Sequence, residues 1–374
     1  MTRYKSWLFL LAALLLAACS KDSEQAGGDL PDPGPVLPET KEAPLSLFAA
    51  TRMAVIDAGE AYDPIHIFLM SGETATTTTH KTEGQFIYDG TWKSTIGVKN
   101  PHNCIYGFSP ATAASATIST SSTYNNGAVL TLKNISPVTG SDICVIVGIK
   151  HGTSAADVAG VPDQGNFYFE KGVYNHVSLL LDHLFAKIDF SVRIDADYHK
   201  MRAIKVKKIE LLSDKTLKEV AVPLTANADN NSPIGTITYA VENVTAGAER
   251  PSGIIYDYND DTNPDHSDGV DLPEDASWTI PGYFAPGGEA EGAIGRHLLL
   301  RFTYDIYAYD VFNNNKCTRV RENCEAINSL SDVSGLAGLL RGQSTTITLT
   351  VKPTYLYALS ESELNNPAIV VNSD

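Results

Sequence analysis

The side chains of this chain that could do chemistry are nine histidines and five cysteines, and they form no recognisable catalytic pattern. No histidine pair has the HExxH spacing that binds zinc on a helix, and neither a GxSxG nucleophile turn nor a GxxxxGKS/T phosphate loop occurs. His183 lies in an apolar run, where a hydrogen-bonded core histidine is expected rather than a catalytic one. No cysteine belongs to paired CxxC motifs. The sequence therefore predicts no enzyme, no catalytic residue, no metal site and no cofactor.

Cys19 is the one cysteine whose neighbours favour a specific modification. Arg3 and Lys5 precede an unbroken apolar run, Trp7–Ala18, which is shorter than the roughly 20 residues that cross a bilayer but fits a secretion signal. The run ends in Leu-Ala-Ala-Cys, which resembles the lipobox of bacterial lipoproteins. It predicts a signal peptide over residues 1–18 and a lipid, with palmitate among its acyl chains, on Cys19. The alternative is an ordinary cleaved signal followed by a chance cysteine.

Residues 19–44 form a predicted flexible tether, because they are polar and rich in Gly, Pro and acidic side chains and cannot build a core. Ser20, Lys21, Asp22 and Glu24 resemble the acidic signal that sends some lipoproteins to the cell surface. The simple start of a linker is an equally good interpretation. The sequence thus predicts a lipid-anchored protein of the outer membrane, exposed on the cell surface.

Composition excludes some classes of function. The net charge is −16, so the basic face that a nucleic-acid partner requires is not expected. Charged residues make up 19% of the chain, and 17 Tyr and 12 Phe accompany abundant Thr and Ser, a mixture that favours strands over helices.

Short runs with strand character cover the chain from Leu45 onward. The predicted strands are Leu45–Thr51, Ile65–Met70, Gln85–Tyr88, Thr91–Val98, Cys104–Phe108, Ala128–Leu132, Ile143–Ile149, Phe167–Phe169, Ile188–Ile194, Ile204–Leu212, Glu219–Leu224, Gly235–Val241, Ser277–Ile280, His297–Phe312, Thr318–Glu322 and Thr345–Val351. Asp89-Gly90 predicts a hairpin turn. Helical character is confined to Ala326–Leu340. This pattern predicts an all-β fold of sandwich type, with a domain junction near Asp182–Ala186.

Two features leave alternatives open. Cys104, Cys144, Cys317 and Cys324 could form two disulfides in an oxidising compartment, with Cys317 and Cys324 closing a hairpin, or could be free buried thiols. The acidic stretch at residues 257–275 could bind calcium. It lacks the glycine of an EF-hand loop, since His266 stands at that position, so a solvated loop is the main expectation.

Four segments, taken in order, resemble the fimbrillin or Mfa-like family of type V pilus subunits. They are Leu45–Arg52 (LSLFAATR), Tyr88–Trp92 (YDGTW) followed by Tyr106–Pro110 (YGFSP), Asp182–Phe190 (DHLFAKIDF) followed by Met201–Leu212, and Pro353–Tyr357 (PTYLY). The resemblance implies two tandem transthyretin-like β-sandwich domains, at 45–182 and 183–374. It also implies an exported lipoprotein whose subunits join by donor-strand exchange.

In that family a surface protease cuts after an arginine that follows the first strand, and a strand of another subunit fills the groove left behind. The resemblance places this cut between Arg52 and Met53, with Leu45, Leu47 and Ala49 as one face of the leader strand. Arg52 could equally be an exposed residue at the end of a strand that stays in place. The expected donor is Tyr355–Leu359 with Ala368–Val371, unless that segment simply closes the second domain.

The function implied is that of a structural or adhesive fimbrial subunit, and stalk, tip and anchor roles all remain open. Its expected partners are other pilus subunits, the outer membrane, and ligands on host or bacterial surfaces. The alternative is a surface glycan-binding lipoprotein of a carbohydrate-uptake system. Such proteins use exposed tryptophans as stacking platforms, and beyond the signal only Trp92 and Trp278 are available.

Replacing Cys19 with alanine should abolish lipid attachment and membrane association, because the thiol is the predicted acceptor of the anchor. Metabolic labelling with a fatty acid measures this directly. Label that persists in the Cys19→Ala protein would show that the lipid, if any, is attached elsewhere.

Overall fold

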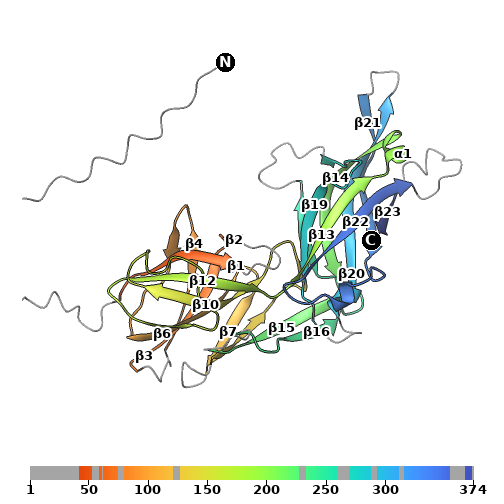
Figure 1. Cartoon of the computed structure of the whole chain (residues 1–374). Helices are drawn as coiled ribbons and strands as arrows, with labels where there is room; N and C mark the ends of the chain where they lie inside the picture. The colour runs from red at the N-terminus through yellow and green to blue at the C-terminus, as the bar shows by residue number, and fades with distance from the viewer. Residues whose placement is uncertain are drawn as a thin grey trace, which may run out of the picture. The chain divides into compact units, whose positions relative to one another are not determined.

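The computed structural model confirms the predicted all-β fold (Figure 1). It describes residues 42–52, 59–60, 62–74, 80–120, 127–226, 233–258, 269–287, 293–310, 316–353 and 367–372, all within one compact unit, Thr40–Asp374. Cys19, the signal peptide and all but the last three tether residues lie outside this part, so their assignments stay predictions. No helix in the described ranges has the length and apolar character needed to cross a membrane.

The first sheet is nine-stranded and is built from the N-terminal part of the described chain. Its strands are β1 (Leu45–Arg52), β2 (Gly59–Glu60), β3 (Ile65–Gly72), β4 (His80–Tyr88), β5 (Trp92–Ser94), β6 (His102–Ser109), β10 (Cys144–Gly152), β11 (Tyr168–Glu170) and β12 (Asn175–His183). They run in the order β2-β1-β12-β10-β6-β3-β4-β5, and β11 also pairs with β6. Ala43, before β1, bridges to Val98, after β5, so the two ends of the sheet approach each other.

The predicted hairpin turn at Asp89-Gly90 joins β4 to β5. Tyr88 pairs with Trp92 across the turn. Gly90 has φ of 73°, a left-handed conformation that glycine adopts without a steric penalty. The hairpin is therefore fixed by local sequence, as predicted.

A four-stranded sheet combines segments that are far apart in the sequence. Its strands are β7 (Ser115–Thr120), β8 (Ala128–Lys133), β15 (Lys215–Leu224) and β16 (Thr238–Asn243), in the order β16-β15-β8-β7. The antiparallel pairing of β15 with β8 crosses the position at which the sequence predicts a domain boundary. The boundary between residues 182 and 183 itself stays a prediction.

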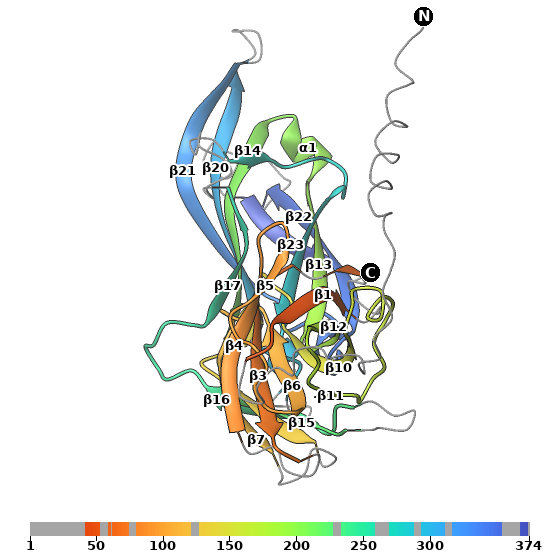
Figure 2. The ribbon, with the colours of Figure 1, turned by 90° about the vertical axis from the view of Figure 1, so that its left-hand side faces the viewer.

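Two five-stranded sheets contain most of the remaining chain. One has the order β23-β22-β13-β19-β9, from β9 (Val138–Thr139), β13 (Ala186–Ile194), β19 (Trp278–Phe284), β22 (Ser344–Pro353) and β23 (Pro367–Asn372). The other has the order β17-β14-β20-β21 with β18 beside β14, from β14 (Arg202–Ser213), β17 (Ser252–Asp257), β18 (Val270–Asp271), β20 (Leu298–Asp310) and β21 (Lys316–Ser329). Figure 2 shows β20 and β21 as a long hairpin. The helices within the described ranges are α1 (Ala196–His199), η2 (Ile294–Arg296) and η3 (Leu336–Gly338).

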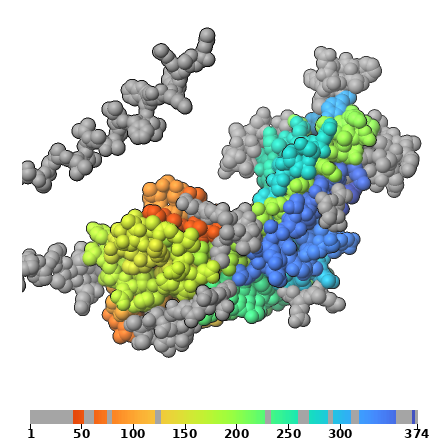
Figure 3. Space-filling view, viewed as in Figure 1, coloured from red at the N-terminus to blue at the C-terminus, as the bar shows by residue number. Residues whose placement is uncertain are grey.

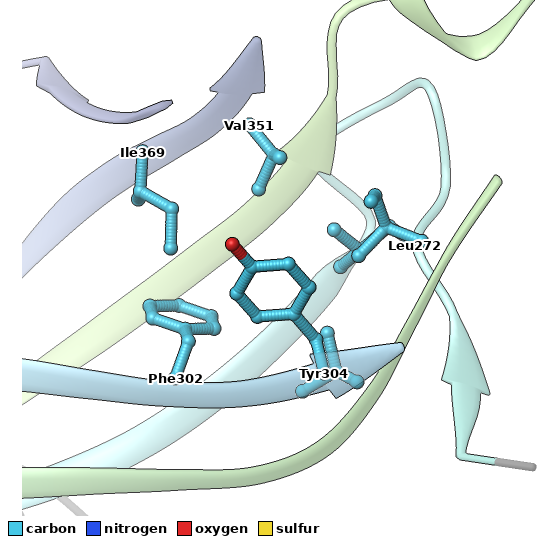
Figure 4. Close-up of a pocket in the computed structure, with 7 residues that line it drawn as sticks. Leu272, Phe302, Tyr304, Val351 and Ile369 are labelled. Atoms are coloured by element: carbon cyan, nitrogen blue, oxygen red, sulfur yellow. The ribbon is translucent and has the colours of Figure 1, made fainter. Parts of the chain in front are cut away.

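A narrow apolar pocket marks where these two sheets face each other (Figure 4). It is lined by Ile204, Val206, Leu272, Phe302, Tyr304, Val351 and Ile369. Alternate residues of β14 and of β20 contribute to it, as the two-residue period of a strand requires. The packing of these side chains from opposed sheets is that of a β-sandwich core.

One prediction for the region after residue 316 is wrong, and one of the two alternatives for its cysteines does not fit the structure. The predicted helix at Ala326–Leu340 is occupied instead by the end of β21, by turns, and by η3. Cys317 and Cys324 cannot close a hairpin because both lie on β21, seven positions apart at about 3.3 Å per residue, whereas a disulfide needs Cα atoms within about 7 Å. Cys104, Cys144 and Cys324 are free buried thiols.

Candidate functional site

Strand β1 is held in the first sheet chiefly by one neighbour. It runs parallel to β12, from Leu45 beside Asn175 to Arg52 beside Leu181. On its other side, β2 pairs only with Thr51 and Arg52. Figure 3 shows the red atoms at the start of the described chain at the surface, beside the yellow-green segment that contains β10 and β12. Within the described residues, removing β1 breaks one long ladder and one short one.

The buried face of β1 is set by a bulge. Leu45 and Leu47 are each 5% exposed and Ala50 is 1% exposed. The register passes from Leu47 directly to Ala49, which skips Phe48 and leaves its side chain 47% exposed. The prediction that Ala49 shares a face with Leu45 and Leu47 is therefore wrong: the extra residue shifts the alternation, and Ala50 takes that place.

Arg52 ends β1 and is not the freely exposed residue that one interpretation of the sequence expects. Its side chain is 18% exposed. One guanidinium nitrogen, Nη2, donates to Asp63 Oδ2 at 3.2 Å, and Nε lies 3.9 Å from Asp142 Oδ2. The backbone of Arg52 pairs with Leu181 and Gly59. Both the side chain and the peptide backbone of Arg52 are thus held within the folded sheet.

A buried polar cluster lies where three adjacent strands end. Asp142 precedes β10, Cys144 begins β10, and His183 ends β12, directly opposite Cys144 in the antiparallel pairing. Asp142 Oδ2 accepts a hydrogen bond from His183 Nδ1–H at 2.7 Å and one from Cys144 Sγ–H at 3.2 Å. The parallel pairing of β1 with β12 brings Arg52 to the same end of the sheet. Burial of all three residues is essentially complete.

The electrostatics of the cluster keep the Cys144 thiol protonated. Burial raises its pKa well above the usual value, and the Asp142 carboxylate raises it further by opposing a second negative charge. Arg52 acts in the opposite direction. Oδ1 of Asp142 is buried and has no hydrogen-bond partner within the described residues. The cation that faces this carboxylate is Arg52, whose Nε lies 3.9 Å from its other oxygen, Oδ2.

A second ion pair flanks the cluster. Arg341 Nη1 donates to Asp182 Oδ2 at 2.7 Å and to the carbonyl oxygen of His183 at 3.1 Å. The other carboxylate oxygen of Asp182 accepts from the backbone N–H of His183 at 2.8 Å. These bonds fix the backbone of His183 and hence the position of its ring.

The remaining predicted site residues are distributed as follows. Met53 and the donor segment Tyr355–Leu359 lie outside the described residues, as do residues 259–268 of the acidic stretch. His183 is the buried, hydrogen-bonded histidine that the sequence predicts. Ala368–Val371 lies in β23, which pairs with β22 at the edge of its sheet.

Sequence reasoning did not identify the cluster of Asp142, Cys144 and His183. These residues are separated by up to 41 positions and follow no motif with local spacing. The available signal was the pair of polar residues placed at the ends of apolar strands, Asp142 before one and His183 after another.

Comparison with solved structures finds similar chains among fimbrial and adhesion proteins. A fimbrial protein from Bacteroides vulgatus is 14% identical, with 89% of this chain and 98% of that chain covered and a TM-score of 0.36. A candidate cell adhesion protein from Bacteroides fragilis is 10% identical, with coverage of 89% and 98% and a TM-score of 0.42. A fimbrial protein from Bacteroides ovatus is 9% identical, with coverage of 82% and 48% and a TM-score of 0.30. Neither a family model nor a curated protein matches the sequence.

The two carboxylates that face Arg52 should contribute unequally to stability. Asp142→Asn should lower the free energy of unfolding by about 2–3 kcal/mol, because it removes a buried charge that is paired and hydrogen-bonded. Asp63→Asn, the matched control, should cost less than about 1 kcal/mol, because the Asp63 side chain is 47% exposed. Urea unfolding at neutral pH measures both. Equal losses of unfolding free energy would show that the buried carboxylate of Asp142 stabilises the fold no more than the exposed carboxylate of Asp63 does.

Proposed function

We propose that this chain is a structural subunit of a surface fimbria and that its subunits join by strand exchange after β1 is cut away behind Arg52. The observation that carries the proposal is how β1 is packed and paired in the first sheet. It is the first strand of the fold, it buries an apolar face, and one long ladder holds it. The role is that of a building block and requires no catalytic residue.

The energetics of β1 make it a suitable leader strand. Burying Leu45 and Leu47 contributes roughly 1.5–3 kcal/mol each, and Ala50 adds less. Without β1, the β12 edge from Asn175 to Leu181 loses its parallel partner. A sheet edge with unpaired backbone groups beside an apolar slot binds an added strand strongly, since both defects are repaired together.

The contacts of Arg52 bear on how the cut occurs. A protease must bind an extended, accessible segment, yet Arg52 is hydrogen-bonded in the sheet and only 18% exposed. Cleavage therefore requires the end of β1 to open locally first. Folded precursor should be cut slowly, which protects the subunit until it reaches the surface, held there by the predicted lipid on Cys19.

The proposed donor is the C-terminal segment that contains β23. In this chain β23 occupies the outer position of its sheet, paired with β22, and Ile369 fills one side of the apolar pocket (Figure 4). An edge strand can leave its sheet by breaking a single ladder. Partners are accordingly other copies of this chain or homologous subunits.

The glycan-uptake alternative has no comparable support. Trp92 and Trp278, the two tryptophans within the described ranges, are partly buried and pack against the hydrophobic core. Trp92 also contacts Tyr88 edge to face, with ring centroids 5.3 Å apart. Neither offers the isolated flat face on which a sugar ring stacks.

Limited digestion with an arginine-specific protease tests the proposal on a chain that lacks the signal peptide. The expected product begins at Met53 by N-terminal sequencing and forms oligomers by size-exclusion chromatography with light scattering. The matched control is Arg52→Lys, which keeps the cation beside Asp142 but removes the cleavage site, and it should stay monomeric.

A synthetic peptide with the sequence of β1 refines the result. Added in excess after cleavage, it should refill the groove and suppress the oligomers, whereas a peptide with Leu45 and Leu47 replaced by aspartate should not. A product that starts at Met53 yet remains monomeric at high concentration would contradict assembly by exchange of this strand.

A further inference from the structure

The buried cluster brings together three side chains of the kinds that bind metal ions. A carboxylate oxygen of Asp142, the sulfur of Cys144 and a ring nitrogen of His183 all lie within 4.8 Å of one another. The separations are 2.7 Å for oxygen to nitrogen, 3.2 Å for oxygen to sulfur and 3.7 Å for sulfur to nitrogen. Thiolate, imidazole and carboxylate are all groups that zinc accepts as ligands.

In the uncut chain, the guanidinium of Arg52 is the positive charge beside these three donor atoms. Its Nε lies 3.9 Å from the same Asp142 oxygen that both other donors contact, and this Nε makes no hydrogen bond among the described residues. The buried Oδ1 of Asp142 has no hydrogen-bond partner there either. The positive charge of Arg52 therefore balances the charge of the Asp142 carboxylate. Its Oδ1 atom is left without a hydrogen-bond partner among the described residues.

We propose that Asp142, Cys144 and His183 form a latent binding site for a thiophilic divalent cation, zinc, which the guanidinium of Arg52 blocks until that residue departs. A divalent ion among these donors would lie close to the guanidinium, and like charges at such distances repel by several kcal/mol inside a protein. Arg52 is the last residue of the leader in the proposed cut, so cleavage would carry the blocking cation away with β1.

The geometry of the three donors suits zinc with small adjustments. Bonds of about 2.0 Å to nitrogen and oxygen and about 2.3 Å to sulfur, at tetrahedral angles, place ligand atoms about 3.3–3.5 Å apart. The observed separations, 2.7 to 3.7 Å, bracket this range. Cys144 and His183 face each other in the ladder of β10 and β12, which keeps the two ligands together when β1 is absent. The departure of Arg52 also leaves room for water as a fourth ligand.

The proton balance of binding is simple. The Cys144 thiol gives its proton to solvent as the sulfur–metal bond forms. His183 stays neutral: Nδ1 turns its lone pair to the metal, and the ring proton moves to Nε2. One proton is released per metal bound, so affinity should rise with pH.

The site would give the cleaved subunit a temporary clamp. Loss of β1 exposes the edge of β12, and a metal bridging Asp142, Cys144 and His183 would tie β12 to β10 until a donor strand arrives. This consequence rests on the proposed function, whereas the binding site itself is tested on uncut chain.

The experiment uses the uncut chain without its signal peptide, carrying Arg52→Met, which removes the charge and keeps an unbranched side chain. Cobalt(II) is the probe, because a thiolate–cobalt bond gives a charge-transfer absorption and tetrahedral cobalt gives intense visible bands. The Arg52→Met protein should bind one equivalent of cobalt(II), and added zinc should displace the bound cobalt. Wild type and Arg52→Lys should bind at least about 100-fold more weakly, because the cation remains.

Cys144→Ser in the Arg52→Met background controls for the other thiols and should abolish the absorption. If Arg52→Met unfolds in metal-free buffer, recovery of near-ultraviolet circular dichroism on adding zinc supports the site, and failure to recover counts against it. Equal cobalt affinity of wild type and Arg52→Met would overturn the role of Arg52. Since no variant is cut, failure here leaves strand exchange intact, and monomeric cleaved subunits would leave the metal site intact.

Discussion

The carboxylate of Asp142 is the constraint on which the arrangement of the first sheet depends. A buried carboxylate is tolerated only when it is hydrogen-bonded and faces a cation. The hydrogen bonds come from β10 and β12 through Cys144 and His183, and the cation comes from β1 through Arg52. Three strands must therefore end at one place for the charge to be accommodated. The parallel pairing of β1 with β12 and the antiparallel pairing of β10 with β12 satisfy this requirement.

Because of this constraint, β1 is held in the sheet both by hydrophobic burial and by electrostatic attraction. Leu45, Leu47 and Ala50 hold the strand by burial along its length, and Arg52 holds its end by charge. A strand held by leucines alone could slide by two residues and keep an apolar face inward. The bulge at Phe48 and the ion pair at Arg52 fix one register. Removing the strand consequently costs the sheet both an apolar face and a countercharge. A replacement strand that supplies only the apolar face leaves Asp142 without the charge of Arg52, although the hydrogen bonds from Cys144 and His183 remain.

The parts of the fold that local sequence determines were predictable. The strand at Leu45–Thr51 and the turn at Asp89-Gly90 were both predicted from local sequence, and the structure contains the strand and the hairpin. Strand β7, with the sequence SATIST, was not predicted because its small polar residues carry little hydrophobic signal, and pairing with β8 stabilises it instead. The predicted helix at Ala326–Leu340 failed because its apolar residues belong partly to β21, where tertiary pairing with β20 overrides weak helical propensity. The buried cluster was unpredictable for a different reason: its members meet only through long-range strand pairing, which no local pattern encodes.

The two ends of the described chain differ in a way that gives the proposed assembly a direction. The acceptor slot would lie beside β12 in the first sheet, whereas the donor β23 lies at the edge of another sheet. Because donor and acceptor are different surfaces of one molecule, a contact between copies is heterologous and head to tail, and such contacts generate open filaments unless they close into a ring. In the proposed assembly each subunit would donate once and accept once, so the filament would grow without branching. A copy that keeps β1 can donate but cannot accept, and it would therefore terminate the filament. Under the proposed assembly, one fold would serve for both extension and termination, according to whether β1 remains beside β12.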